Sequence, residues 1–338
     1  MNRNVLVTGG AGYIGSHTTV SLLDAGDDVV IYDDLSNSSP HAIEAIEAIA
    51  GRAPTFVQGD VRDEAALGKL FAEHPIDAVV HCAAKKAVGE SVELPVLYWD
   101  VNVGGTMKLL AAMTDAGVVD LVFSSSATVY AEDAPRPLVE DSPLGPTNPY
   151  GSTKFVVERL LADVAPAGEW RFTSLRYFNP VGAHPSGDLG EDPRGIPNNL
   201  MPRILHFATQ DQPSITIYGD DWPTPDGTGV RDYLHVVDLA EAHLAALDAR
   251  PEPGTHRAIN VGTGQGVSVL ELVAGVERAS GVTFERIVQE RRPGDVAASF
   301  ATVDHAVEVL GWRATRGLDD MCADSWRWFE RHPQGFAG

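Results

Sequence analysis

Short apolar runs and longer segments of helical spacing alternate along the first 125 residues. Apolar runs at residues 4–8, 28–32, 55–57, 78–81 and 121–125 predict buried strands. Segments that end at residue 25 and that span residues 64–73 and 102–116 have apolar residues every three or four positions, which predicts helices. This alternation predicts an α/β fold with a doubly wound parallel sheet, whose ligands bind beyond the carboxyl ends of the strands.

The composition changes after residue 178. Residues 179–199 are rich in glycine and proline, and a loop of that length in a compact domain is usually functional. Beyond it we expect helices near residues 200–209, 239–249, 269–280 and 318–332, and short strands near 216–218, 233–236 and 258–261. The pattern therefore predicts a sheet domain over residues 1–178 and a smaller mixed α/β domain over residues 179–338, with some of the later chain crossing back to the sheet.

A glycine-rich turn follows the first strand directly. Glycines at 9, 12 and 15 allow a tight strand-to-helix turn, backbone approach to a pyrophosphate and close packing of helix on strand. Asp33 ends the second strand, 18 residues after Gly15. A carboxylate there can accept both ribose hydroxyls and would repel a 2′-phosphate, so the pattern favours a Rossmann sheet that binds NAD rather than NADP. The competing interpretation is an acidic turn before a loop.

Tyr150 and Lys154 are the candidates for proton transfer. Pro149 precedes the first of them and no proline follows until Pro166, so a helix is expected to begin at Tyr150. Side chains four residues apart share one helix face, where an ammonium would favour the phenolate form of a phenol whose ordinary pKa is about 10. Ser126, at the end of an earlier strand, can hold a substrate oxygen. By itself the Tyr-Lys spacing also fits an ordinary amphipathic helix.

Charge and hydropathy narrow the class of protein. The chain has 338 residues, 44% of them apolar, and a net charge of −22, which argues against nucleic acid and anionic membranes as partners. No apolar run approaches the ~20 residues that cross a bilayer, and no signal-peptide segment precedes the first strand, so a cytoplasmic enzyme is expected. Cys82 and Cys322 form neither a disulfide framework nor a metal spacing, and the histidines show no metal motif. No metal is therefore expected.

Four motifs together resemble the extended short-chain dehydrogenase/reductases. They are Thr8-Gly-Gly-Ala-Gly-Tyr-Ile-Gly15, Ser124-Ser-Ser-Ala-Thr-Val-Tyr130, Tyr150-x-x-x-Lys154 and Arg176-Tyr-Phe-Asn-Pro-Val-Gly-Ala-His-Pro-Ser-Gly187. Within that family the chain is most similar to the UDP-glucose 4-epimerases, over nearly its whole length, and the block at 176–202 is the most specific part. The resemblance implies a homodimer that holds NAD tightly and interconverts UDP-glucose and UDP-galactose through a 4-keto intermediate.

The resemblance also implies roles for individual residues. Catalysis would rest on Ser126, Tyr150 and Lys154. The cofactor would contact Gly9, Gly12, Tyr13, Ile14, Gly15, Asp33, Asn37, Asp60, Val61, Cys82, Ala83, Ala84, Lys86 and Phe178. The UDP-sugar would contact Lys86, Ser126, Asn179, Asn199, Leu200, Tyr218, Arg231, Arg292, Asp295 and Ser299. Asp34, Val101 and the Cys82-Ala-Ala84 stretch depart from the residues that relatives often carry.

Two other functions stay open at this point. A sugar-nucleotide 4,6-dehydratase of the same family would need an acid pair beside the serine triplet, where this chain has Ala127-Thr128. A non-catalytic NAD-binding sensor would be expected to lose the base, but Tyr150 and Lys154 are both present. Ser299 is small where relatives restricted to plain hexoses tend to carry tyrosine, so we expect UDP-N-acetylhexosamines to be accepted as well. The resemblance, together with apolar helix faces at 103–113 and 155–161, predicts a homodimer built as a four-helix contact.

Overall fold

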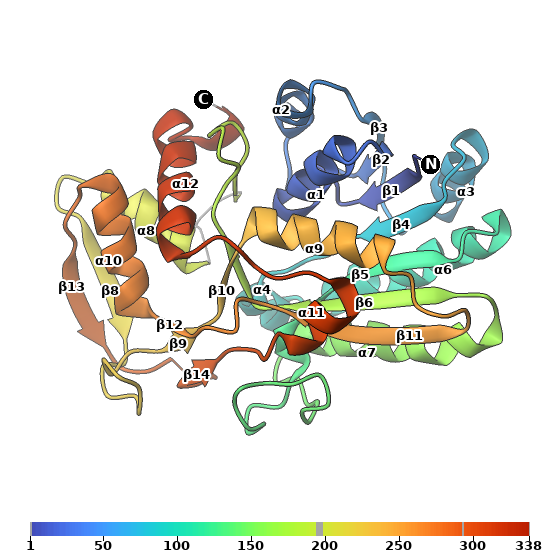
Figure 1. The fold of residues 1–338 in the computed structure, drawn as a ribbon. Helices are drawn as coiled ribbons and strands as arrows, with labels where there is room; N and C mark the ends of the chain where they lie inside the picture. The colour runs from blue at the N-terminus through green and yellow to red at the C-terminus, as the bar shows by residue number, and fades with distance from the viewer. Residues whose placement is uncertain (1, 194–198, 293, 338) are drawn as a thin grey trace.

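The computed structural model describes residues 2–193, 199–292 and 294–337, so part of the predicted glycine- and proline-rich loop lies outside the described residues. Its centre is a seven-stranded, fully parallel sheet in the order β11-β6-β5-β4-β1-β2-β3, which confirms the predicted fold class (Figure 1). The strands are β1 (Asn4–Thr8), β2 (Asp28–Asp33), β3 (Thr55–Gln58), β4 (Ala78–His81), β5 (Asp120–Ser126), β6 (Arg171–Tyr177) and β11 (Thr255–Val261).

Helices cover both faces of this sheet because successive strand residues point to opposite sides. Val5 and Val7 of β1 pack with α1 (Tyr13–Asp24), α2 (His41–Ala50) and α9 (Val236–Asp248) in one core. Leu6, between them, packs on the other side with α3 (Glu64–Glu73), α6 (Gly105–Ala116) and α7 (Pro149–Val164). The predicted apolar runs in the inner strands are thus buried from two sides, as a parallel sheet requires, whereas β3 at the edge of the sheet is only partly buried.

The start of the predicted helix over 102–116 differs from the structure. The short helices α4 (Val88–Glu93) and α5 (Pro95–Tyr98) lead into a π-helix, η1 (Trp99–Gly104), and only then into α6. Inside η1, the Asn102 side chain exchanges two hydrogen bonds with the Lys85 backbone, at 2.8 and 3.0 Å, and donates to Thr153 Oγ1 at 3.0 Å. The wider turn therefore ties the loop after β4 to α7, a constraint that apolar spacing does not encode.

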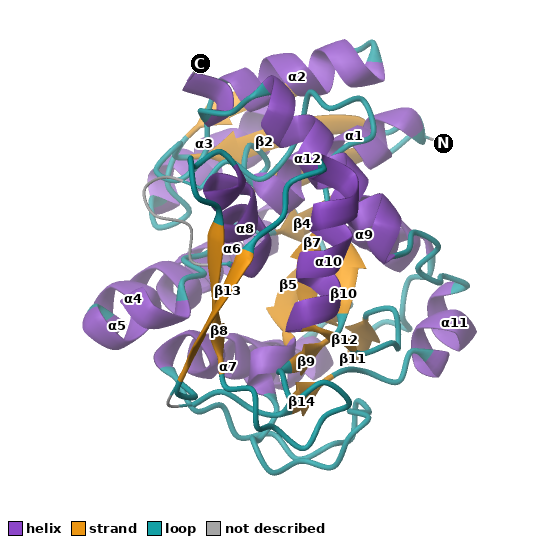
Figure 2. Ribbon diagram, turned by 90° about the vertical axis from the view of Figure 1, so that its left-hand side faces the viewer, coloured by secondary structure: helices purple, strands orange, loops and turns teal. Residues whose placement is uncertain are grey.

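The chain beyond residue 178 forms smaller sheets and a separate helical layer, and it also returns to the central sheet. Figure 2 shows β8 (Ser214–Tyr218) and β13 (Glu285–Gln289) as a parallel pair away from that sheet. β11 pairs with β6, and α9 packs against α1. The remaining elements are β7 (Asn179–Val181), α8 (Leu200–Ala208), β9 (Val230–Arg231), β10 (Tyr233–His235), β12 (Val267–Ser268), α10 (Val269–Ser280), β14 (Ala298–Ser299), α11 (Asp304–Leu310), α12 (Leu318–Arg331), and the 3-10 turns η2 (Ala127–Val129), η3 (Ala165–Ala167) and η4 (Gly335–Ala337).

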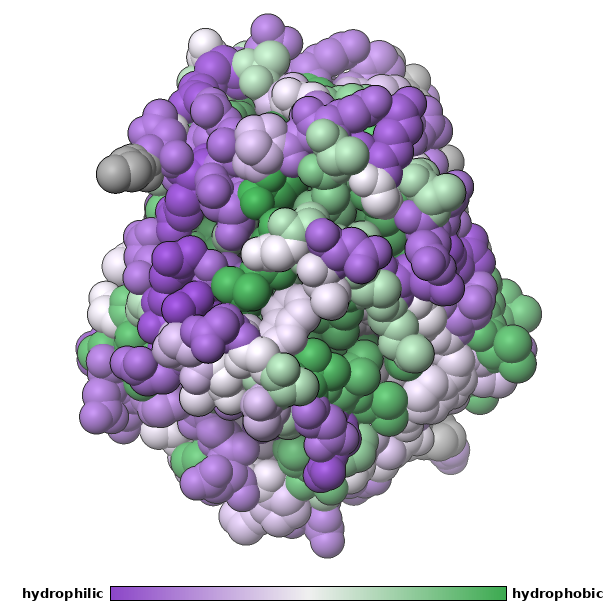
Figure 3. All heavy atoms as spheres, turned by 90° about the vertical axis from the view of Figure 1, so that its right-hand side faces the viewer, coloured by the Kyte–Doolittle hydropathy of each residue, from purple (hydrophilic) through white to green (hydrophobic). Residues whose placement is uncertain are grey.

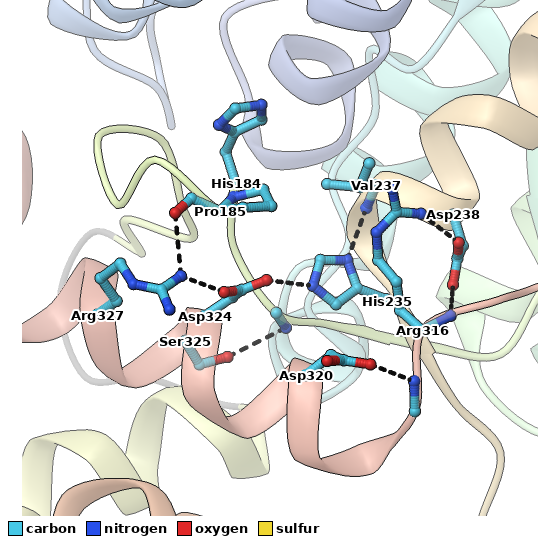
Figure 4. Close-up of polar contacts among 12 residues, drawn as sticks. His184, Pro185, His235, Val237, Asp238, Arg316, Asp320, Asp324, Ser325 and Arg327 are labelled. Carbon is cyan, nitrogen blue, oxygen red and sulfur yellow. Dashed lines mark hydrogen bonds and ion pairs between the residues drawn. The ribbon is translucent and has the colours of Figure 1, made fainter.

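Helix α12 is held by polar side chains on its inner face (Figure 4). Asp324 lies 3.2 Å from His235 Nε2 at the end of β10 and also accepts from Arg327, whose guanidinium donates to the Pro185 carbonyl at 3.0 Å. Ser325 Oγ accepts from the Gly182 backbone at 3.1 Å. These bonds fix residues 182–185 against α12, and the chain then runs on into the functional cavity described below.

The surface adds little that would point to a membrane or a metal. The face shown in Figure 3, where β1 begins, mixes hydrophilic and hydrophobic residues. Within the residues that the structure describes, no helix is long and apolar enough to cross a membrane. Across the same residues, no three His, Cys, Asp or Glu side chains are grouped to hold a metal ion.

Candidate active site

A cavity of about 600 Å³ opens at the carboxyl ends of β1, β2, β3, β4 and β6. The glycine-rich turn, these strand ends, the start of α7 and part of the segment after β7 line it. The predicted site residues that line it are Gly9, Gly12, Tyr13, Ile14, Gly15, Asp33, Asn37, Asp60, Val61, Cys82, Ala83, Ala84, Lys86, Tyr150, Lys154 and Asn199. The structure therefore brings most of the predicted cofactor residues and two of the three predicted catalytic residues to one place.

The glycine-rich turn packs closely against the neighbouring backbone beside the cavity. Gly9 has φ +70°, and a Cβ built there would lie 2.7 Å from the Ala83 nitrogen. A Cβ on Gly15 would lie 2.1 Å from the Gly9 carbonyl oxygen, so no other residue fits at either position. Helix α1 begins at Tyr13 without a side-chain cap or an acidic residue in its first turn. Its exposed N–H groups and positive dipole end fit a pyrophosphate.

Asp33 lines the cavity and also braces the turn. Its carboxylate accepts hydrogen bonds from Ala11 N at 3.1 Å, Leu35 N at 2.9 Å and Ser38 Oγ at 2.7 Å. Burial raises the pKa of this carboxyl, while these hydrogen bonds oppose the rise. Sequence reasoning assigned Asp33 to ribose recognition alone, whereas in the structure its carboxylate also holds the strand end, the turn and the following loop together.

Lys86, Asn199 and Glu191 form a small polar cluster at the cavity wall. Glu191 Oε1 lies 2.9 Å from Lys86 Nζ and 3.0 Å from Asn199 Nδ2. The nearby Tyr13 hydroxyl donates to the Gly182 carbonyl at 2.7 Å, which ties the glycine-rich turn to the segment after β7. Sequence reasoning missed Glu191 because nothing within its loop marks it. Glu191 is recognised as a site residue only because the folded loop brings it to Lys86.

Tyr150 and Lys154 share one face of α7, as their spacing predicts. Asn148 caps the helix by accepting from Gly151 N at 2.9 Å, and Pro149 occupies the first turn. Both side chains are buried, at 8% and 3% exposure. Lys154 Nζ lies 5.9 Å from the centre of the Tyr150 ring but donates its hydrogen bond to the Ser124 carbonyl at 2.7 Å.

The pKa values of Tyr150 and Lys154 differ from the sequence-based expectation that Lys154 would favour the phenolate. Burial raises the pKa of Tyr150 to about 12, although a hydrogen bond with Ser126 acts to lower it. Burial lowers the pKa of Lys154 to about 8, while the charges of Cys82 and Glu158 act to raise it. Desolvation is the largest cause of both shifts, and for Tyr150 it outweighs the hydrogen bond that acts to lower the pKa. The ammonium alone does not prepare Tyr150 as a base, because the buried site penalises both charged forms.

Ser126 and Phe178 do not line the cavity directly. Ser126 ends β5, and its Oγ accepts from Thr128 N at 3.2 Å and from Thr128 Oγ1 at 3.0 Å. Its hydrogen bond with the Tyr150 phenol keeps it within reach of the site. Phe178 is buried in a separate apolar cluster with Val129, and the neighbouring Tyr177 lines the cavity instead. Alternation along the strand decides which of these two aromatic rings faces the ligand.

Five of the predicted UDP-sugar residues form a second group outside the cavity lining, whereas Lys86 and Asn199 line the cavity. Arg231 and Arg292 both pair with Asp295, at 3.8 and 3.0 Å, and the Arg292 guanidinium lies 4.7 Å from the centre of the Tyr218 ring. Ser299 of β14 is the parallel pairing partner of Arg231 in β9. A strand pair and one acid therefore assemble five residues that are spread over 82 positions of sequence, from 218 to 299.

Two predicted substrate residues stand apart from that group. Asn179 begins β7 with an exposed side chain, and its N–H donates to the Asp232 carbonyl at 3.0 Å. Leu200 begins α8 and packs on the apolar core of the C-terminal part. Both flank the segment that carries Glu191, on either side of residues 194–198.

Together, the parallel sheet, the glycine-rich turn and the Tyr-Lys pair define a nucleotide-dependent enzyme of the short-chain dehydrogenase type. Comparison with family models agrees: residues 5–262 match the NAD dependent epimerase/dehydratase family. This match covers more than half of the chain, and the chain belongs to that family.

Individual relatives are similar over their whole length. The UDP-glucose 4-epimerase of Erwinia amylovora is 52% identical over 98% of this chain and 99% of its own, and that of Bacillus subtilis is 51% identical over 98% of both. Among solved structures, a UDP-glucose 4-epimerase from Stenotrophomonas maltophila with bound NAD and formylated UDP-arabinopyranose superposes with a TM-score of 0.95 at 50% identity, covering 98% of this chain and 99% of the other. The enzyme from Bifidobacterium longum in complex with NAD+ and UDP gives 0.94 at 48% identity, covering 98% and 100%.

Proposed function

We infer that this chain is an NAD-dependent epimerase that inverts carbon 4 of UDP-hexoses and so interconverts UDP-glucose and UDP-galactose. The observation that carries this inference is the meeting of a glycine-rich dinucleotide turn with Tyr150 and Lys154 in one cavity. The relatives described above, similar over their full length, support it. The arginine group around Asp295 supports a nucleotide-sugar substrate, because guanidinium groups bind diphosphates well.

The residues present fit NAD. The close backbone packing at Gly9 and Gly15 keeps the turn tight beside the cavity, the uncapped start of α1 suits the pyrophosphate, and the Asp33 carboxylate suits a ribose without a 2′-phosphate. Asn37, Asp60 and Val61 would hold the adenosine half, and Cys82, Ala83, Ala84 and Lys86 the middle of the cofactor. When bound, NAD supplies a hydride acceptor that later returns the hydride, so that no net redox change occurs.

The chain's own groups handle the proton. Tyr150 takes the proton of the sugar's 4-hydroxyl as carbon 4 is oxidised and returns it when carbon 4 is reduced from the opposite face. Because burial alone holds the Tyr150 pKa near 12, ionisation needs positive charge in addition to Lys154, and the oxidised nicotinamide ring would bring one. Ser126, which already bonds the phenol, would hold the sugar oxygen in line. The arginines would keep the UDP anchored while the 4-keto sugar turns over.

Two features argue against the other functions. The position beside the serine triplet is the short turn η2, where Ala127 and Thr128 offer no carboxyl group for a dehydratase. A binding sensor has no need for the buried Lys154 ammonium beside a phenol, an arrangement that costs stability through desolvation.

A homodimer is part of the proposal. Several apolar side chains are exposed on the helices from α4 to α6, at 63% for Val92, 80% for Val96 and 55% for Met107. The structure buries Met113 and Leu161 completely within the chain, so the contact would be centred on the earlier helices, which pack against α7. Light scattering should give twice the 36.1 kDa mass of one chain, and a value equal to one chain would end this part of the proposal.

We also place the enzyme in the cytoplasm, because both of its cysteines are free thiols, as is usual in that reducing compartment.

The activity is tested by incubating the purified protein with UDP-galactose and separating the products by chromatography. UDP-glucose should form without added cofactor, and NAD should be released when the protein is denatured. A 4-keto-6-deoxy product would favour the dehydratase, and binding of NAD without turnover would favour the sensor.

A further inference from the structure

The Lys154 ammonium depends for its position on one backbone oxygen. Lys154 is 3% exposed, and its Nζ donates to the Ser124 carbonyl at 2.7 Å and lies 4.8 Å from the centre of the Phe123 ring. An ammonium has three donors, and it is this bond that sets where the other two can reach into the cavity. Whatever fixes the Ser124 peptide therefore fixes the charge beside Tyr150.

At Ser124, strand β5 pairs with another strand on one side only. Strand β4 ends at His81, which pairs with Phe123, whereas β5 continues to Ser126 with β6 as its partner. Side-chain contacts replace the missing strand: Ser124 Oγ lies 3.0 Å from His243 Nε2 and 3.2 Å from Cys82 Sγ. His243 comes from α9, more than a hundred residues later in the chain.

The direction of these bonds can be read from the chemistry of His243. Its Nδ1 lies 2.9 Å from the Leu239 carbonyl, which can only accept, so the proton is on Nδ1 and Nε2 must accept from the Ser124 hydroxyl. The imidazole is fully buried, and burial lowers its pKa to about 4, which keeps it neutral at physiological pH. With its proton committed to His243, Ser124 Oγ accepts from the Cys82 thiol.

We infer that His243 is a positioning residue of the active site: by holding the Ser124 hydroxyl it fixes the strand end whose carbonyl directs the Lys154 ammonium toward Tyr150. The inference rests on the function proposed above, in which Lys154 assists the proton transfer of Tyr150. It assigns a catalytic consequence to a buried histidine that touches neither the cavity nor, in the proposed reaction, the substrate.

The chain contains a matched control for a purely structural effect. His256 of β11 makes the same kind of bond, with Nε2 2.8 Å from the Ser174 hydroxyl in β6. Burial lowers the pKa of His256 to about 4, as it does for His243. Ser174 lies in the middle of its strand, paired on both sides, and holds no active-site group. His256→Phe therefore removes a similar bond from the same sheet without removing any hydrogen-bond partner of Ser124 or Lys154.

The kinetic test compares His243→Phe, His243→Gln and His256→Phe in the full-length protein with bound cofactor. We expect His243→Phe to lower kcat by about tenfold with KM changed by less than about twofold, because a misplaced charge acts on the reacting state and not on the UDP anchor. The acidic limb of the pH-rate profile should move to higher pH, since a displaced ammonium favours the phenolate less. Glutamine, whose side-chain oxygen can accept from Ser124, should restore part of the loss, and His256→Phe should leave kcat and the limb unchanged.

A second readout follows Lys154 directly and does not depend on turnover. The chain has five lysines, at 69, 85, 86, 108 and 154, so the Cε signals of ¹³C-lysine-labelled protein can be assigned by substitution. Lys154, with a pKa lowered to about 8 by burial, should titrate apart from the exposed lysines. The groups that face it are Cys82, Glu158, Tyr150 and His81. Losing the His243 contact should lower the Lys154 pKa further, because the bond that favours the ammonium is weakened.

The outcomes separate the inference from the proposed function. An inactive wild-type protein would overturn the proposed function, and the lysine titration would still test the positioning. An active enzyme whose His243→Phe and His256→Phe variants lose the same activity, with the acidic limb and the Lys154 titration unmoved, would overturn the positioning role. If His243→Phe does not fold, Ser124→Ala removes the same hydroxyl with little change in volume and must give the same shifts, or the inference is wrong.

Discussion

The cofactor half and the substrate half of this site are built by different means. Around the cofactor cavity the backbone itself forms the walls, at strand ends and at glycines where a Cβ would collide within 3 Å. Around Asp295 the site consists of long side chains, and the Arg292 guanidinium is 53% exposed. Backbone walls depend little on which side chains stand beside them, whereas a site made of side chains depends directly on the residues present. In the proposed function, the chemistry therefore lies on the half with backbone walls, the rigid half, and the choice of substrate lies on the half built of side chains, the adaptable half.

The largest effect is expected on the rigid half, from Tyr150→Phe. Loss of the hydroxyl removes the group that takes the proton, so turnover should fall by about 10³-fold or more. The phenyl ring keeps the packing, and NAD should remain bound at wild-type stoichiometry. Turnover of UDP-galactose and cofactor content per chain measure the two effects. Activity within a few-fold of wild type would place the base elsewhere.

Lys154→Met tests the same half through its charge. The ammonium favours the phenolate, so its loss raises the phenol pKa, and the enzyme should need a higher pH to reach a given fraction of its maximal rate. The pH-rate profile is the measurement, with the acidic limb expected to move upward. An acidic limb at the wild-type position would show that Lys154 does not act on the phenol.

Arg292→Ala tests the adaptable half. Removing a guanidinium that binds the diphosphate should raise KM for UDP-galactose by about tenfold while the cofactor stays bound. Arg286→Ala is the control, because Arg286 of β13 pairs with Glu277 of α10 at 2.8 Å and donates to the Phe284 carbonyl, neither of which is a predicted site residue. Equal effects of the two substitutions on KM would mean that Arg292 has no special contact with the substrate.

Asp33→Asn should weaken the discrimination between cofactors. The carboxylate repels a 2′-phosphate, so its neutralisation should lower the preference for NAD over NADP by about tenfold. Reconstitution of the cofactor-free protein with each nucleotide gives the ratio. Asp34→Asn, at the exposed neighbouring acid, should change it less. Release of NADP from the wild-type protein would contradict the assignment outright.

Ser299→Tyr addresses the finest distinction, between plain and N-acetylated sugars. Ser299 pairs with Arg231 and is half-buried, so a ring at this position would take up space next to the arginine group. We expect wild type to epimerise UDP-N-acetylglucosamine and the Ser299→Tyr variant to lose that activity several-fold more than the activity on UDP-glucose. No turnover of the acetylated sugar by wild type, or an unchanged ratio in the variant, would exclude this role.

The sequence by itself determined the first five strands of the sheet, the turn and the pairing of Tyr150 with Lys154, but it did not predict β6 and it assigned the strand near 258–261 to the second domain. These features depend on neighbours within about one helical turn or one strand, where apolar spacing, glycine and proline act directly on the backbone. The same local information located α10 to the residue, at Val269–Ser280. It did not reveal η1, because a π-helix here depends on what Asn102 can bond across the fold.

Only the tertiary structure decided how these parts are tuned. It turned Tyr177 rather than Phe178 toward the cavity, and it brought Glu191 to Lys86 across 105 residues. It also set the proton chemistry: the sequence predicts that Lys154 ionises Tyr150, whereas burial raises the Tyr150 pKa to about 12 and lowers the Lys154 pKa to about 8. The physical reason is that desolvation and long-range hydrogen bonds depend on the three-dimensional surroundings of a group, which spacing along the chain does not specify.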